Sequence, residues 1–127
     1  MKRYSSGSEF EHKIGYSRVV DDGHYVHVSG TTGYDYSNMT IAAEAPLQAE
    51  QCLRNIENAL SLAGCSREDV VRVRYLFVDR ADFAACQTIL KEYFGPAPPA
   101  ATLEITGLYD LAMKLEIEVT ARSPSGL

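Results

Sequence analysis

The sequence predicts a single α+β domain in which two helices pack on one face of a mixed sheet. Two segments repeat apolar residues at intervals of three and four, as amphipathic helices do. The remaining structured segments are continuously apolar or alternate apolar with polar residues, as strands do. Read in order, the segments give β-β-α-β-α-β-β. The 127 residues suit one domain, which we assign to residues 1–127.

The first half of the chain predicts a β-hairpin followed by a helix. We expect strands over residues 16–20 and 24–29, a loop over 30–39 and a helix over 46–63. Gly23 supplies the positive φ that a hairpin turn needs, and Gly64 is placed to end the helix. The loop is rich in Gly, Tyr and Asn, so it is either the wall of a pocket or a surface connection with locally packed tyrosines. Residues 1–14 are polar and show no period.

The second half predicts a strand, a helix and two closing strands. We expect a capped turn over residues 66–69, strands over 70–78, 100–107 and 113–121, and a helix over 80–94. Residues 70–78 are nearly all apolar, which is typical of a central strand with both faces covered. The last two strands are expected to be joined by a short turn. In the final strand apolar and polar residues alternate strictly, so its polar face meets either water or a site.

Composition excludes several classes of protein. The net charge of -5 argues against nucleic acid as the main partner. There is no apolar run of membrane-spanning length and no apolar signal core, so we expect a cytoplasmic protein that does not bind membranes. Cys52, Cys65 and Cys86 are far apart, and burial as free thiols is expected for Cys52 and Cys86. His24 and His27 should face opposite sides of a strand, so no metal site is predicted.

Two helices can cover only one face of the sheet. The other face carries Tyr25, His27 and charged side chains among apolar ones. A face of this size predicts self-association, most simply into a closed ring. Arg72 and Arg74 share a strand face, which favours a solvated or interfacial ion-pair surface over a ligand contact.

Several motifs together resemble the Rid family, the RidA/YjgF-like proteins. The most specific are Val28-Ser29-Gly30, the D-V-V-x-V segment at residues 69–73, Asp82-Phe83 and the K-x-E-I-E-x-x-A segment at 114–121, within a resemblance that spans residues 14–121. The resemblance implies a chorismate-mutase-like fold and a homotrimer with small-molecule clefts between subunits. It also implies that no metal or organic cofactor is needed. Many family members hydrolyse reactive enamines and imines to a 2-keto acid and ammonia.

Carried over by position, the resemblance assigns the water-handling carboxylate to Glu116. The substrate-binding positions are Tyr16, Ser29, Gln87, Ala100, Ala101 and Thr102. In the family an arginine in a P-A-R-[ST] motif clamps the substrate carboxylate, but the aligned residue here is Ala100, or Ala101 if the alignment shifts by one. Alanine cannot bind a carboxylate by charge. Arg18 and Arg74 are the candidates to replace the missing guanidinium.

These observations predict a RidA-like protein that hydrolyses an imine, an enamine or a related small carbonyl compound without the usual α-carboxylate. A non-catalytic trimer that binds a metabolite or a protein is the alternative. An endoribonuclease or translation inhibitor is the least favoured function, because the chain is acidic and has no basic stripe.

Overall fold

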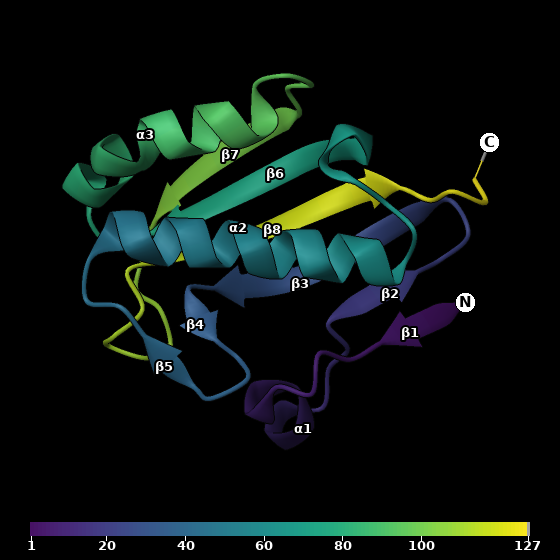
Figure 1. The fold of residues 1–127 in the computed structure, drawn as a ribbon, viewed down its shortest axis with the longest axis horizontal. Coiled ribbons are helices and arrows are strands. Elements are labelled where there is room, and N and C mark those ends of the chain that lie inside the picture. Colours follow the sequence, from purple (N-terminus) through teal and green to yellow (C-terminus); the bar gives the residue numbers. More distant parts are fainter. Residues whose placement is uncertain (127) are drawn as a thin grey trace.

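A computed structural model describes residues 1–126. Its six-stranded mixed sheet has the order β1-β2-β3-β8-β6-β7 (Figure 1). The strands are β1 (Lys2–Tyr4), β2 (Val19–Asp21), β3 (Tyr25–Thr32), β6 (Val70–Phe77), β7 (Ala100–Ile105) and β8 (Leu115–Arg122), with a separate pair β4 (Tyr34–Asp35) and β5 (Thr40–Ile41). The helices are α1 (Glu9–Ile14), α2 (Ala45–Leu62), α3 (Arg80–Phe94) and the 3-10 turn η1 (Arg67–Asp69).

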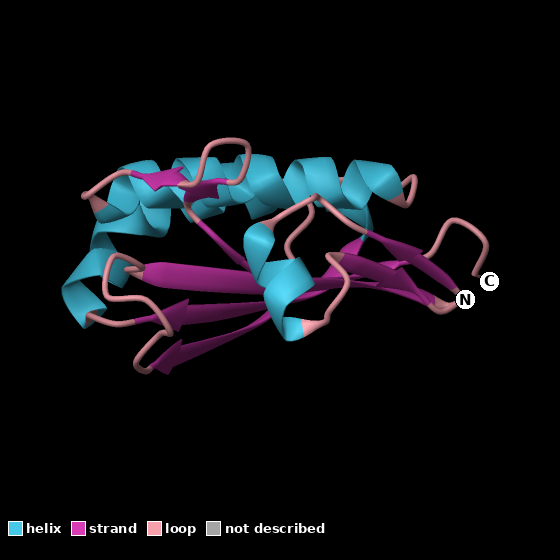
Figure 2. Cartoon of the chain, turned by 90° about the horizontal axis from the view of Figure 1, so that it is seen from below, coloured by secondary structure: helices cyan, strands magenta, loops and turns pink. Residues whose placement is uncertain are grey.

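The two long helices form where the apolar spacing predicts them. Helix α2 has Pro46 in its first turn, where the missing N–H costs nothing, and it buries an apolar face that includes Cys52 and Ile56. Helix α3 begins after Asp79, whose side chain accepts a hydrogen bond from the Ala81 N–H at 2.8 Å. Long helix α2 lies along one face of the sheet, and no helix of the described chain covers the opposite face (Figure 2).

Strand β8 is the centre of the sheet, because it pairs antiparallel with both β3 and β6. Buried and partly exposed residues alternate along β8, as the alternation of apolar and polar residues predicts. Leu115, Ile117 and Val119 are buried in the core, whereas Glu116 and Glu118 lie on the other face. Strand β6, predicted as a central strand, does lie between two neighbours, but Arg72 and Arg74 are not buried.

The prediction that the two closing strands are joined as a hairpin is wrong. Strand β6 lies between them: β7 pairs parallel with β6 on one side, and β8 pairs antiparallel with β6 on the other. Helix α3 carries the chain back along β6, so β7 enters in the same direction as β6 and takes the outer edge. The turn after β7 then crosses β6 and places β8 against β3.

The N-terminal segment also departs from expectation, since it forms β1 and α1. Ser8 caps α1 by accepting a hydrogen bond from the Phe10 N–H at 3.1 Å, and Gly15 ends the helix with a φ of 90°. The buried residue of this six-residue helix is the charged Glu11, so the helix has no apolar period for sequence reasoning to find. The loop predicted over residues 30–39 is shorter than expected, because β3 continues to Thr32 and β4 follows.

Cys52, Cys65 and Cys86 are free and buried, as predicted for the first and last of them. Within residues 1–126 no group of three or more His, Cys, Asp or Glu side chains could hold a metal ion. None of the described helices is long and apolar enough to cross a membrane.

Candidate functional site

A cleft of about 410 Å³ opens on the sheet face that carries Glu116 and Glu118, opposite the face on which the core packs. Its walls come from α1 and the segment after it, from β3, from the segment between β4 and β5, from β8 and from the turn that precedes β8. The lining residues are Phe10, Ile14, Tyr16, Ser29, Gly30, Thr32, Tyr36, Tyr109, Met113, Glu116 and Glu118. Three residues that the resemblance assigns to the site, Tyr16, Ser29 and Glu116, therefore line one cleft.

Glu116 projects into this cleft from the central strand, where it lies in register with Thr32 of β3 and Leu76 of β6. The carboxyl group lies so close to Gly30 that a β carbon built at Gly30 would be 2.8 Å from its Cδ. Burial raises the pKa of Glu116 above its usual range, the charge of Glu118 raises it further, and Arg18 offsets part of the rise. A carboxylate with these surroundings is suited to accept and return a proton.

Tyr16 and Ser29 are both held by hydrogen bonds beside Glu116. The Ser29 hydroxyl donates to the Ser17 carbonyl at 2.6 Å, so its hydrogen is engaged within the protein. The Tyr16 hydroxyl accepts a hydrogen bond from Arg18 Nη2 at 3.3 Å. Burial raises the pKa of Tyr16, so the phenol stays protonated at neutral pH and can donate to a ligand.

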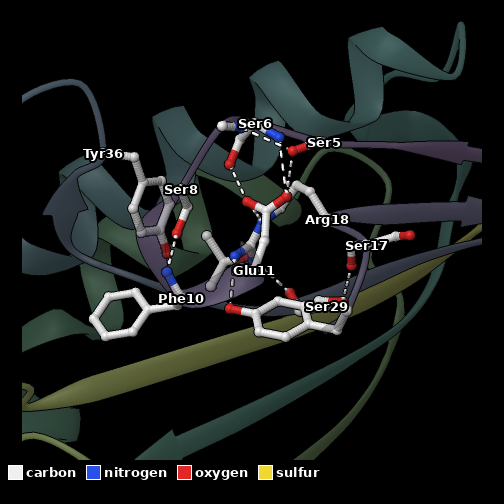
Figure 3. A network of polar contacts seen from close by, with 12 residues as sticks. Ser5, Ser6, Ser8, Phe10, Glu11, Ser17, Arg18, Ser29 and Tyr36 are labelled. Carbon is white, nitrogen blue, oxygen red and sulfur yellow. Dashed lines mark hydrogen bonds and ion pairs between the residues drawn. The ribbon is translucent and has the colours of Figure 1, made fainter. Parts of the chain in front are cut away.

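Arg18 lies beneath the cleft floor and is only 2% exposed. Its Nε faces Glu11 Oε2 at 3.5 Å (Figure 3). Its Nη1 donates to the Gly30 carbonyl at 2.8 Å and to Thr31 Oγ1 at 3.0 Å. The guanidinium also faces the rings of Tyr16 and Tyr36 at 5.6 and 5.2 Å. Its N–H groups thus support the floor, and the side chain is not placed to clamp a substrate carboxylate.

Arg74, the other candidate cation, is occupied by two carboxylates on the open sheet face. It pairs with Glu104, which accepts from Nε at 3.1 Å, and with Glu118, which accepts from Nη1 at 3.2 Å. This arrangement agrees with the ion-pair interpretation of that strand face for Arg74. Arg72, beside it, donates from Nη1 to Thr102 Oγ1 at 3.1 Å.

The remaining predicted residues lie away from the cleft of the same chain. Ala100 is in register with Arg72 and Thr102 with Arg74, so both lie on β7, which is separated from β8 by β6. Glu104 of β7 and Glu116 of β8 are both in register with Leu76 of β6. Ala100 and Thr102 therefore lie four and two residues along β7 from the position opposite Glu116.

Gln87 and Ala101 line a separate, mostly apolar pocket of about 290 Å³ between α3 and the sheet, together with Tyr75, Phe83 and Leu90. A single chain therefore separates the predicted site into two parts, one around Glu116 and one around β7.

The walls of the Glu116 cleft include side chains that sequence reasoning did not assign to the site. Phe10 and Ile14 come from the unpredicted α1, and Tyr109 comes from the turn before β8. The loop over residues 30–39 was expected to be either a pocket wall or a surface connection with locally packed tyrosines, and its tyrosines show both arrangements. Tyr36 lines the cleft, whereas Tyr34 is buried and donates to Asp110 Oδ2 at 2.6 Å.

Comparison with known proteins agrees with this architecture. A sequence model described as "Endoribonuclease L-PSP" matches residues 7–123. A "RutC family protein in leuC 5'region" of Leuconostoc mesenteroides subsp. cremoris is 35% identical over 112 residues, which cover 84% of this chain and 85% of that protein. The "2-iminobutanoate/2-iminopropanoate deaminase" of Mus musculus is 32% identical over 108 residues, covering 84% of this chain and 79% of the relative.

Among solved structures, Rv2704 of Mycobacterium tuberculosis superimposes with a TM-score of 0.86 at 34% identity, covering 95% of this chain and 98% of that one. It is described as a member of the YjgF/YER057c/UK114 family. The structure of RidA from Psychrobacter sp. PAMC 21119 matches with a TM-score of 0.80 at 29% identity, covering 85% and 88% of the two chains. The chain therefore belongs to the YjgF/RidA family, and its sheet and two long helices have the fold of that family.

Proposed function

We propose that this protein hydrolyses an imine, an enamine or a related small carbonyl compound, with Glu116 as the catalytic residue. The observation that carries the proposal is the partly buried Glu116 carboxyl group in a cleft of ligand size, beside Tyr16 and Ser29. Relatives named as 2-iminobutanoate/2-iminopropanoate deaminases support the reaction class.

The chemistry requires one base and one water molecule. Glu116 takes a proton from water as the oxygen attacks the C=N carbon, which forms a carbinolamine. The same carboxyl group then returns the proton to nitrogen. As the C–N bond breaks to release ammonia, the hydroxyl of the carbinolamine gives its proton to the carboxylate and becomes the carbonyl. A raised pKa suits both steps, because the group binds a proton more readily than an exposed glutamate does.

The substrate in this proposal has no α-carboxylate in the usual place. Ala100 and Ala101 stand where the resemblance puts the clamping arginine. Arg18 is buried with its N–H groups engaged, and Arg74 is paired with two glutamates. None of these residues offers a free guanidinium for a bidentate contact.

We further propose that the active form is a single-domain homotrimer whose clefts lie between subunits. In that arrangement Gln87, Ala100 and Thr102 of one copy would complete the Glu116 cleft of the next, whereas Ala101 faces α3 within its own chain. Two features support this: the uncovered sheet face and the separation of the two parts of the site within one chain. Native mass spectrometry at micromolar concentration should give the mass of three chains, and a monomer would contradict the shared cleft.

Turnover assays test the reaction directly. The protein should accelerate release of the carbonyl product from imines that an amine oxidase generates in the same cuvette, and Glu116→Gln should abolish that acceleration. Glu104→Gln is the matched control, since it changes a carboxylate of the same sheet face outside the cleft. With enzymatically generated 2-aminoacrylate we expect no faster pyruvate release than in buffer. Loss of activity in both glutamine variants, or in neither, would contradict the assignment.

A non-catalytic binding trimer is the second candidate, and the missing arginine favours it. Binders found by thermal shift, together with turnover that is unchanged in Glu116→Ala, would support this function over hydrolysis. The endoribonuclease description of the family model is opposed here by the net charge of -5. RNA cleavage that Glu116→Gln abolishes would reverse that judgement.

A further inference from the structure

Aromatic side chains dominate the walls of the Glu116 cleft. Phe10, Tyr16, Tyr36 and Tyr109 all line it, from four different parts of the chain. Phe10 and Tyr109 meet edge to face with their centroids 6.5 Å apart, so they form one continuous wall. Aromatic faces attract cations through their quadrupole, and rings gathered around one space are the recurring way in which proteins bind organic ammonium groups.

The charges around the cleft leave one negative charge without a partner. Arg18 beneath the floor is paired with Glu11, and Glu118 at the rim is paired with Arg74. Glu116 makes no ion pair with any side chain of residues 1–126, and the lining of the cleft includes neither Lys nor Arg. The electrostatic field inside the cleft therefore favours a positive ligand and opposes a negative one.

We infer that the ligand of this cleft is an organic cation, an ammonium or iminium group on a small apolar body. The charged group would lie against the Glu116 carboxylate and the body against Phe10, Tyr36 and Tyr109. A volume of about 410 Å³ accommodates such a molecule. The inference rests on the proposed function for its reaction, and it narrows the substrate to an iminium ion derived from an amine rather than from an amino acid.

This substrate class fixes the reaction that must precede hydrolysis. A two-electron oxidation of an amine, by an amine oxidase or amine dehydrogenase, gives the iminium ion. Hydrolysis then adds water across the C=N bond and breaks it, so that R₂C=NH₂⁺ and H₂O give R₂C=O and NH₄⁺. Atoms and charge balance without a further reactant, and Glu116 carries the proton between oxygen and nitrogen.

Binding of benzyltrimethylammonium, measured by calorimetry, tests the inference without any turnover. This ion has a fixed positive charge, an aromatic body and no bond that the proposed reaction can hydrolyse. We expect Glu116→Gln to raise its Kd about tenfold or more through loss of the charge. We expect Tyr109→Leu to raise the Kd about threefold, as for an exposed cation–π contact. Tyr109 is 87% exposed, so the second variant should fold normally.

Two controls make the result decisive. Glu104→Gln should bind the cation as the wild type does, because Glu104 is paired with Arg74 outside the cleft. Phenylacetate, an anion with a similar body, should not bind. Preferential binding of phenylacetate, with loss of that binding in Arg72→Gln beside Thr102, would overturn the inference in favour of a carboxylate site.

The inference and the proposed function can fail separately. Cation binding that depends on Glu116, without hydrolysis of any amine-derived imine, would keep the inference and reject the hydrolase. Hydrolysis of imines that depends on Glu116, without measurable binding of benzyltrimethylammonium at millimolar concentration, would keep the hydrolase and reject the cation site.

Discussion

Gly30 leaves the space that the Glu116 carboxyl group occupies. A β carbon at Gly30 would stand 2.8 Å from Glu116 Cδ and 2.9 Å from Oε1. Both atoms belong to the end of a flexible side chain, so the carboxyl group would move aside and the fold would remain. Gly30→Ala should therefore lower turnover by about 100-fold, the effect of misplacing a reacting group by about 1 Å, with little change in melting temperature.

Gly33 provides the contrast for this prediction. A β carbon there would meet the backbone of Gln48 at 2.6 Å, where nothing flexible can yield. Gly33→Ala should lower the melting temperature, measured by circular dichroism, by several degrees more than Gly30→Ala does. Equal melting temperatures, or full activity in Gly30→Ala, would show that the glycine does not position Glu116.

Arg18 and Glu11 form a buried ion pair, and removing one partner should be costly. Both side chains are almost inaccessible, at 2% and 4% exposure. Arg18→Met keeps the volume but leaves the Glu11 carboxylate without its cation, so we expect the free energy of unfolding in urea to fall by about 3 kcal/mol. Hydrogen bonds to Glu11 from the Ser5 hydroxyl and the Ser6 N–H remain. We therefore expect a loss of stability at the lower end of the range for breaking buried ion pairs.

Adding Glu11→Gln to Arg18→Met supplies the control, because it removes the stranded charge. The double variant should recover part of the lost stability. If the free energy of unfolding decreased by less than about 1 kcal/mol in the single variant, the structural role of Arg18 would be contradicted.

The long elements of the fold could be predicted because their residues carry strong periods. The alternation of residues 113–121 identifies β8 and its buried face, and the Gly and Pro residues after α3 mark the end of that helix. The partners of β7 could not be predicted, because a strand's own sequence does not encode which neighbour it pairs with. Helix α1 escaped prediction since its buried side chain is the charged Glu11, held by an arginine seven positions later.

The candidate site was predictable only through the resemblance. Nothing in the sequence around Glu116 separates it from the equally alternating Glu118, and only the fold shows that one is partly buried in the cleft and the other is ion-paired with Arg74. Burial also decides that Arg18, one of the two candidate cations, does not replace the missing guanidinium. In the sequence Arg18 looks like any arginine near a strand, yet the fold buries it beneath the floor of the cleft, where it donates to the Gly30 carbonyl.

The raised pKa of Glu116 predicts a coupled pH dependence of activity and stability. Burial and the charge of Glu118 raise the pKa of Glu116 and Arg18 lowers it, while the charge of Glu116 in turn raises the pKa of Tyr16 and of the buried Cys52 thiol. Turnover should fall as pH drops through this raised value, above the ordinary 4.5, because a protonated Glu116 cannot take a proton from water.

Stability should move in the opposite direction over the same window. Between 4.5 and the raised value the folded chain binds a proton that the unfolded chain has released, so this group's contribution to stability falls as pH rises. Glu116→Gln should remove that contribution, so urea unfolding at neutral pH should show a variant at least as stable as the wild type. The difference should vanish below pH 4.5, and a variant less stable at neutral pH would contradict the desolvation of this carboxylate.

Restoring a guanidinium at position 100 should restore activity toward an imino acid. Ala100 lies in register with Arg72 on the neighbouring parallel strand, so Ala100→Arg alone would place two cations side by side. Combining it with Arg72→Gln removes the repulsion and leaves one cation free to bind a carboxylate. We expect the double variant to release pyruvate from 2-aminoacrylate at least about tenfold faster than the wild type, and the single variant to gain less.

Ala101→Arg with Arg72→Gln is the matched control, because Ala101 lines the pocket against α3 instead. Equal gains at positions 100 and 101, or none at either, would show that the missing arginine does not determine the substrate.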